Sequence, residues 1–205
     1  MNKILKEAAA LTVITVIIGL LLGVVYEVTK APIAKQEEKT RTDAWEEVSP
    51  NAVRFKNLNI SGQEKAIRKA LDAAGFQSET VDGAAKAYDE SGNPAGYVIT
   101  VTSKEGYKGD IQFTMGVGED GTTGGISFIH IDETAGLGMN ANTKDFKDQF
   151  KDKQVTSFHY SKTTSQSKDE IDAISGATIT TNAVTNGVNA GLVVFQLIKE
   201  GGIEF

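Results

Sequence analysis

The chain has 205 residues, a formal net charge of −6 at pH 7 and a sequence pI of about 5.0. This acidic balance, without a basic stripe, argues against nucleic acid as a partner. The absence of cysteine excludes disulfides, thiolate zinc sites, iron–sulfur clusters on this chain's own thiolates and cysteine nucleophiles. With only two histidines, we expect no metal site. The length is typical of one soluble domain with an appendage.

The N-terminal segment 1–28 is predicted to be a transmembrane anchor. Its stretch 8–26 carries no charge and is rich in Leu, Ile and Val, and about 20 apolar residues cross a bilayer as a helix. A signal peptide is the competing interpretation, but its apolar region is usually about 7–15 residues long and precedes a small-x-small cleavage site. The longer stretch favours a retained single-pass helix in the cell membrane.

The distribution of basic residues bears on which side of the membrane the rest of the chain lies. Basic residues are more numerous after the apolar stretch than before it, where only Lys3 and Lys6 occur. The positive-inside rule would therefore place the rest of the chain in the cytoplasm. Long domains translocate largely regardless of charge, so this signal is weak.

Segment 29–60 is predicted to be a juxtamembrane helix and linker, and 61–205 to be the main domain. Trp45, the only tryptophan, is expected to pack rather than to take part in chemistry. An amphipathic helix is predicted over 61–75, with Ser61 and Glu64 as a capping box and Gly75 as its end.

The middle of the chain predicts two β-hairpins, because short runs of β-prone residues are separated by turn signals. The expected strands are Ala84–Tyr88, Tyr97–Val101, Ile111–Val117 and Ile126–Ile131. A helix is expected over 144–150, and one further strand over Val155–Tyr160.

A hydroxyl-rich loop at 175–181 leads into a long helix near the C-terminus. Apolar residues recur at helical spacing over 184–198, and Gly201 is placed to cap the end. Thr180 and Thr181 are the N-cap candidates. The free N–H groups and the positive dipole end of such a helix favour an anion, typically phosphate.

This loop resembles the flavinylation motif Asp-x-x-Ser/Thr-Gly-Ala-Thr/Ser-x-Thr of the FMN-binding domain in the G subunit of Rnf-type ferredoxin:NAD+ oxidoreductases. The C subunit of the sodium-translocating NADH:quinone reductase shares it. The matching residues are Asp172, Ser175, Gly176, Ala177, Thr178 and Thr180. The resemblance implies that FMN is bound covalently to Thr180 through a phosphoester bond, with Thr181 beside it. An ordinary helix cap is the alternative.

A second segment resembles the Glu-Thr-Pro-Gly-Leu-Gly loop that packs along the flavin in the same family. The matching residues are Glu133, Thr134, Gly136, Leu137 and Gly138, with Ala135 in place of the usual proline. The glycines let the backbone approach a flat ring closely. Upstream, 106–111 resembles the family's Gly-Tyr-x-Gly-x-Ile element, in which Tyr107 is either a flavin contact or a strand-edge aromatic. No role is implied for His130.

The second loop also contains the pattern G-x-G-x-x-A, at 136–141. A dinucleotide site requires a strand directly before that pattern within a parallel βαβ unit. Because the neighbouring strands are predicted to form hairpins, we do not expect a nucleotide to bind here.

The resemblance implies an α+β fold, with helices packed on an antiparallel sheet, plus one N-terminal transmembrane helix and an extracytoplasmic domain. It implies an electron-relay subunit, without catalytic residues of its own, that connects ferredoxin-side and NAD-side partners and is coupled to Na+ or H+ transport. A separate flavin transferase, using FAD and magnesium, is expected, because no base with an oriented partner is evident near Thr180. The alternatives are the quinone-reductase C subunit and a membrane-anchored scaffold domain without redox activity.

Overall fold

The computed structural model describes residues 2–202, which fall into two units that divide between Thr40 and Arg41. Helix α1 (Asn2–Val48) forms the first unit and contributes residues 41–48 to the second. It is long and apolar enough to cross a membrane. The helix continues through Pro32, so it is not interrupted between segments 1–28 and 29–48. The boundaries at 28 and 60 stay predictions.

The second unit is built on a five-stranded antiparallel sheet in which each strand pairs with the next in sequence. Its strands are β1 (Arg54–Asn57), β2 (Glu79–Tyr88), β3 (Pro94–Ser103), β4 (Ile111–Gly118) and β5 (Thr123–His130). Both predicted hairpins are confirmed, with longer strands than expected. The first strand, β1, was not predicted.

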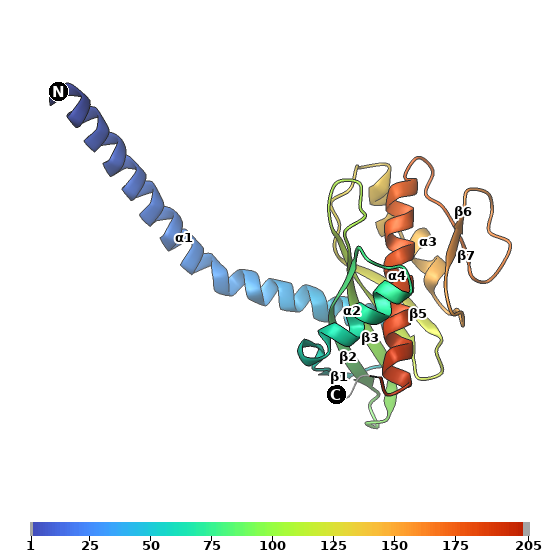
Figure 1. Cartoon of the computed structure of the whole chain (residues 1–205). Coiled ribbons are helices and arrows are strands. Elements are labelled where there is room, and N and C mark those ends of the chain that lie inside the picture. Colours follow the sequence, from blue (N-terminus) through green and yellow to red (C-terminus); the bar gives the residue numbers. More distant parts are fainter. Residues whose placement is uncertain (1, 203–205) are drawn as a thin grey trace. The chain divides into compact units, whose positions relative to one another are not determined.

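Helices α2 (Glu64–Ala73) and α4 (Thr178–Lys199) pack together and against the sheet (Figure 1). The alternation of side chains along a strand divides the apolar residues between its two faces. Ile99 and Val101 of β3 belong to the larger core, which includes the apolar side chains of α4. Val98 belongs instead to a smaller cluster with Trp45 and Val48. Trp45 is therefore a packing residue, as predicted.

Two glycines let the end of α1 approach the sheet backbone. A Cβ atom added at Gly116 would lie 2.1 Å from the carbonyl oxygen of Val48, and one added at Gly124 would lie 2.0 Å from the same atom. Neither position has room for a side chain. Residues 41–48 are thus an integral part of the second unit.

The start of α2 differs from the sequence prediction, whereas its end agrees. A short 3-10 helix, η1 (Ile60–Gly62), precedes α2, and the N-cap residue is Gln63, without a side-chain capping hydrogen bond. The predicted Ser61–Glu64 capping box is therefore wrong, because Ser61 lies inside η1. Gly75, with a φ of 89°, ends the helix as predicted.

The segment between β5 and α4 is built from short elements. They are η2 (Gly138–Asn142), α3 (Lys144–Lys147), η3 (Asp148–Phe150), β6 (His159–Ser161) and β7 (Glu170–Asp172). The helix expected over 144–150 is confirmed as α3 followed by η3. The strand expected over 155–160 is mostly wrong, since β6 begins at His159 and pairs in parallel with β7, outside the main sheet.

Candidate functional site

The motif threonines lie in the first turn of α4, inside the helix. The helix begins at Thr178 and its N-cap residue is Ala177, so the prediction that Thr180 or Thr181 caps the helix is wrong. The hydroxyl of Thr181 instead donates to the carbonyl oxygen of Ala177 at 3.0 Å and accepts the N–H of Ile174 at 3.0 Å. These two bonds fold the 174–177 loop back onto the helix.

The hydroxyl of Thr180 is held by a buried carboxylate. Its Oγ1 donates to Oε2 of Glu133 at 3.0 Å, and the two residues are only 1% and 4% exposed. The other carboxylate oxygen, Oε1, accepts the backbone N–H of Lys108 at 3.2 Å. A carboxylate held by a second hydrogen bond therefore does lie next to Thr180, which the sequence did not lead us to expect. The two residues are 47 positions apart, so no local pattern could reveal the pair.

Two motif glycines are required by the Glu133–Thr180 pair. A Cβ atom at Gly138 would lie 2.6 Å from Thr180 Oγ1 and 2.6 Å from Glu133 Oε2. A Cβ atom at Gly106 would lie 3.0 Å from Glu133 Oε1 and 2.1 Å from the carbonyl oxygen of Gly109. The backbone of both loops therefore encloses the carboxylate.

Large apolar side chains are exposed beside this pair. Tyr107 is 67% exposed, Leu137 is 43% exposed and Ile179 is 52% exposed. A Cβ atom added at Gly176 would contact Leu137 Cδ2 at 3.1 Å, so the two motif loops meet. Ile179, directly before Thr180, was not predicted as a site residue. Exposed apolar groups of this kind are suited to contact with an apolar ligand.

The N-terminus of α4 has no side-chain cap of its own. The first N–H groups of any α-helix have no intrahelical acceptor. Here Ala177 offers no capping side chain, and the first turn holds no acidic residue. The positive end of the helix dipole is therefore not neutralised by the helix itself.

Other predicted residues build the loops. Asp172 is exposed, and its Oδ1 accepts the N–H of Ser165 at 2.6 Å, so it orders the polar loop before β7. Asp172 therefore acts on this loop rather than on Thr180. The carbonyl oxygen of Thr134 accepts the N–H of Leu137 at 3.1 Å, which closes the turn there. Ser175 is exposed.

A second polar cluster on α4 was missed by sequence reasoning. Glu105 Oε2 accepts hydrogen bonds from the side-chain amides of Asn182 at 3.1 Å and Asn186 at 2.7 Å. The spacing of the two asparagines on one helix face is the signal that could have indicated a shared partner. The charge of Glu105 also affects Glu79: burial, and next in size the negative charge of Glu105, raise the pKa of Glu79.

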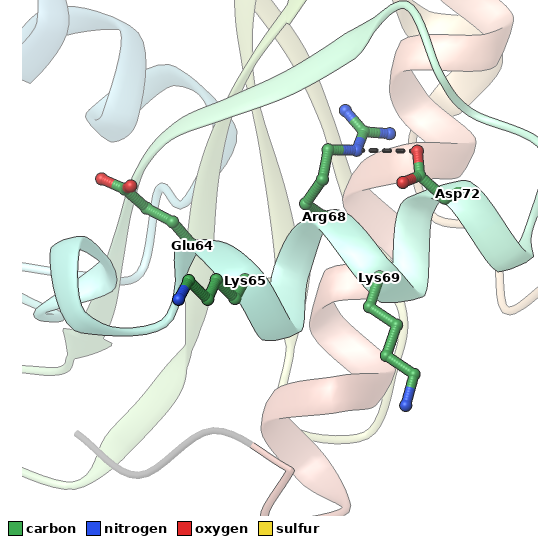
Figure 2. Close-up of a pocket in the computed structure, with 5 residues that line it drawn as sticks. All are labelled: Glu64, Lys65, Arg68, Lys69 and Asp72. Atoms are coloured by element: carbon green, nitrogen blue, oxygen red, sulfur yellow. Dashed lines mark ion pairs between the residues drawn. The ribbon is translucent and has the colours of Figure 1, made fainter.

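Two competing sites lack support. The 136–141 pattern runs into the 3-10 helix η2, and β5 before it is antiparallel, so the strand–helix context of a dinucleotide site is missing. Figure 2 shows a surface hollow lined by charged side chains of α2 alone, where Arg68 pairs with Asp72 at 2.8 Å. None of the motif residues lines it. No group of residues suited to a metal ion occurs within residues 2–202.

Comparison with known proteins matches both parts of the chain. Residues 106–193 match the family of the FMN-binding domain, and residues 1–48 match the RnfG N-terminal region. The chain is 32% identical to the G subunit of the Na(+)-translocating ferredoxin:NAD(+) oxidoreductase complex of Acetobacterium woodii, over 96% of this chain and 94% of that protein. It is 30% identical to the G subunit of the proton-translocating ferredoxin:NAD(+) oxidoreductase complex of Clostridium ljungdahlii, over 91% of this chain and 89% of that protein.

Solved structures with some similarity include the C subunit of the Na(+)-translocating NADH-quinone reductase from Parabacteroides distasonis. It is 23% identical, with a TM-score of 0.49, over 75% of this chain and 80% of that one. The two G-subunit relatives are at least 30% identical to this chain and align over most of its length and of their own. This chain therefore belongs to the family of G subunits of ion-translocating ferredoxin:NAD(+) oxidoreductase complexes.

Proposed function

We propose that this chain is an electron-relay subunit that carries FMN esterified through its phosphate to Thr180. The observation that carries this proposal is the position of the Thr180 hydroxyl in the uncapped first turn of α4. A phosphate on Oγ1 lies within the reach of the unpaired N–H groups and the positive dipole end of that turn. The residues present thus fit the phosphate of FMN.

The surroundings also fit the flavin ring. Tyr107, Leu137 and Ile179 offer exposed apolar surface next to the attachment point, and the glycines of the 133–138 loop allow close approach of the backbone. Thr134 is half-buried and Ser175 is exposed, so both loops also offer a polar side chain. When bound, FMN supplies the redox chemistry, whereas the protein positions it and tunes its environment.

The chain needs partner subunits for electron transfer. It has no cysteine and so holds no iron–sulfur cluster on its own thiolates, which means that electrons have to come from and go to other subunits. The relatives are named as subunits of complexes that connect ferredoxin and NAD(+), one translocating Na(+) and the other protons. We therefore assign the chain a place between ferredoxin-side and NAD-side partners, with Na+ or H+ as the coupling ion.

The covalent bond is tested by the intact mass of the denatured full-length chain, prepared with a flavin transferase, FAD and Mg²⁺. Wild type is expected to gain one FMN and Thr180→Ala none, because the acceptor oxygen is removed. Thr185→Ala is the matched control, since its buried hydroxyl lies on the same helix and donates to the carbonyl oxygen of Thr181 at 2.8 Å. A gain on Thr180→Ala equal to wild type would move the attachment elsewhere.

We further propose that the helix anchors the chain in the membrane and that the FMN domain is extracytoplasmic. A cysteine-free chain allows this to be tested by one introduced thiol. Gln77→Cys, at an exposed position of the domain, is expected to react with a membrane-impermeant maleimide in intact cells. Lys3→Cys, before the apolar stretch, is expected to react only after lysis. The reverse pattern would place the domain in the cytoplasm.

A further inference from the structure

The buried carboxylate of Glu133 contacts the proposed attachment oxygen, Thr180 Oγ1. Burying an ionised group is costly unless it is hydrogen-bonded, and Glu133 has one donor on each oxygen, Thr180 Oγ1 at 3.0 Å and the Lys108 N–H at 3.2 Å. A threonine hydroxyl is a weak nucleophile that needs an adjacent base. We propose that Glu133 is the base that takes the proton from Thr180 during FMN attachment, which rests on the function proposed above.

The step balances without an oxidant or reductant. The donor is a flavin dinucleotide, FAD, held with Mg²⁺ by the transferase. Thr180 Oγ1 attacks the phosphorus on the FMN side of its pyrophosphate and forms the new O–P bond. The bridging P–O bond breaks and AMP leaves, while the hydroxyl proton passes to Oε2 of Glu133. The transferase thus supplies the donor and the metal ion, and the acceptor protein supplies both nucleophile and base.

The neighbouring charges leave Glu133 available for this role. Lys108 reaches Glu133 only through its backbone N–H, because its Nζ pairs with Asp132 at 3.4 Å. Glu105 is bound by two asparagine amides. Within residues 2–202, no ion pair involves Glu133. The Lys108 N–H thus fixes one oxygen and leaves the other directed at Thr180.

The attachment oxygen is not open to solvent. Thr180 Oγ1 is buried, with Gly138 against it. Attack by Oγ1 therefore requires the residues packed around it to open far enough for the phosphorus to reach it. Because Thr180 lies in the first turn of α4, the N–H groups of that turn can stabilise negative charge on the transferring phosphoryl group.

The test is the initial rate of FMN attachment to the full-length chain, with purified transferase, FAD and Mg²⁺, followed by intact mass. Glu133→Gln keeps the size and a hydrogen-bond acceptor but removes the basicity. The kcat for this acceptor is expected to fall about 10²- to 10⁴-fold, which is the usual contribution of a general base. The KM for the acceptor is expected to stay near the wild-type value, and the residual rate to rise with pH as hydroxide replaces the lost base.

Asp145→Asn is the matched control, because it removes an exposed carboxylate on α3 and leaves the Lys108–Asp132 pair beside Glu133 in place. It is expected to be labelled at close to the wild-type rate. Glu133→Asp keeps the base at a longer distance, and is expected to be slower than wild type with an unchanged pH profile. If Glu133→Gln does not fold, Glu133→Asp is the variant that tests whether Glu133 is the base.

The outcomes separate this inference from the proposed function. If wild type is labelled at Thr180 and Glu133→Gln at the same rate, Glu133 is not the base and the covalent flavin stands. A rise in KM with a pH profile parallel to wild type would reduce Glu133 to a structural residue and overturn the inference. If wild type takes up no FMN in the presence of an active transferase, both proposals fail.

Discussion

Adjacent threonines at the start of α4 have separate tasks. The hydroxyl of Thr181 bonds two backbone groups, the N–H of Ile174 and the carbonyl oxygen of Ala177, and so holds the loop in place. The hydroxyl of Thr180 bonds a carboxylate that belongs to another loop. We therefore expect a change at 181 to act on the fold and, under the proposed function, a change at 180 to act on FMN attachment.

Gly138 is the residue whose substitution best tests the packing of this pair. A methyl group at 138 would lie 2.6 Å from both Thr180 Oγ1 and Glu133 Oε2, so Gly138→Ala has to separate them or shift the backbone. We expect a loss of about 1–3 kcal/mol in the free energy of unfolding, as for other overpacked sites, together with slower FMN attachment. Urea titration followed by Trp45 fluorescence measures the first, because Trp45 is buried in the same unit.

Gly109→Ala is the control for that variant. An added Cβ at 109 meets nothing within 4 Å, so both stability and attachment are expected to stay close to wild type. If Gly138→Ala and Gly109→Ala behaved alike, the close contact at 138 would have no energetic consequence.

At the level of whole elements, the long helices and strands are predictable from the sequence. The strands β2 to β5 follow from runs of β-prone residues between turn signals. Helix α4 follows from its helical periodicity and from Gly201, which has a φ of 70° and lies just after its end. The short strands escape this reasoning. In β1 three of four residues are exposed, and β6 and β7 have three residues each, which is too short for a period to be recognised.

Contacts between elements explain the other errors. Phe158 was expected inside a strand, but its N–H and carbonyl oxygen bond the buried amide of Asn189 on α4 at 2.7 and 2.9 Å. These bonds replace a sheet ladder and satisfy the backbone there. Likewise, the two threonines expected to cap α4 lie inside it. Thr180 bonds Glu133 there, and Thr181 bonds the backbone of the 174–177 loop. Each motif residue could be found from the sequence, but its bonding partner could not.

At the scale of the whole molecule, the sequence assigns residues to an anchor and a domain, and contacts decide where the domain begins. Residues 41–48 belong to the second unit, in which Trp45 and Val48 are 6% and 2% exposed. They cover Ala85 and Val98 on the sheet. The sequence does not reveal this, because the same helix is continuous with the apolar anchor and shows no break at that point.

The extent of the domain is tested by truncation. A chain of residues 41–205 keeps the smaller apolar cluster and is expected to be soluble without detergent, to unfold cooperatively and to accept FMN from the transferase. A chain of residues 49–205 keeps β1 but loses Trp45 and Val48, so the face of the sheet around Val98 is exposed to water. Because the loss of a buried tryptophan side chain alone costs about 3–5 kcal/mol, this shorter chain is expected to melt at a much lower temperature by circular dichroism.

Trp45→Ala in the full-length chain provides the same comparison without a new terminus. Equal stability of 41–205 and 61–205 would contradict this division and support the boundary at residue 60 instead.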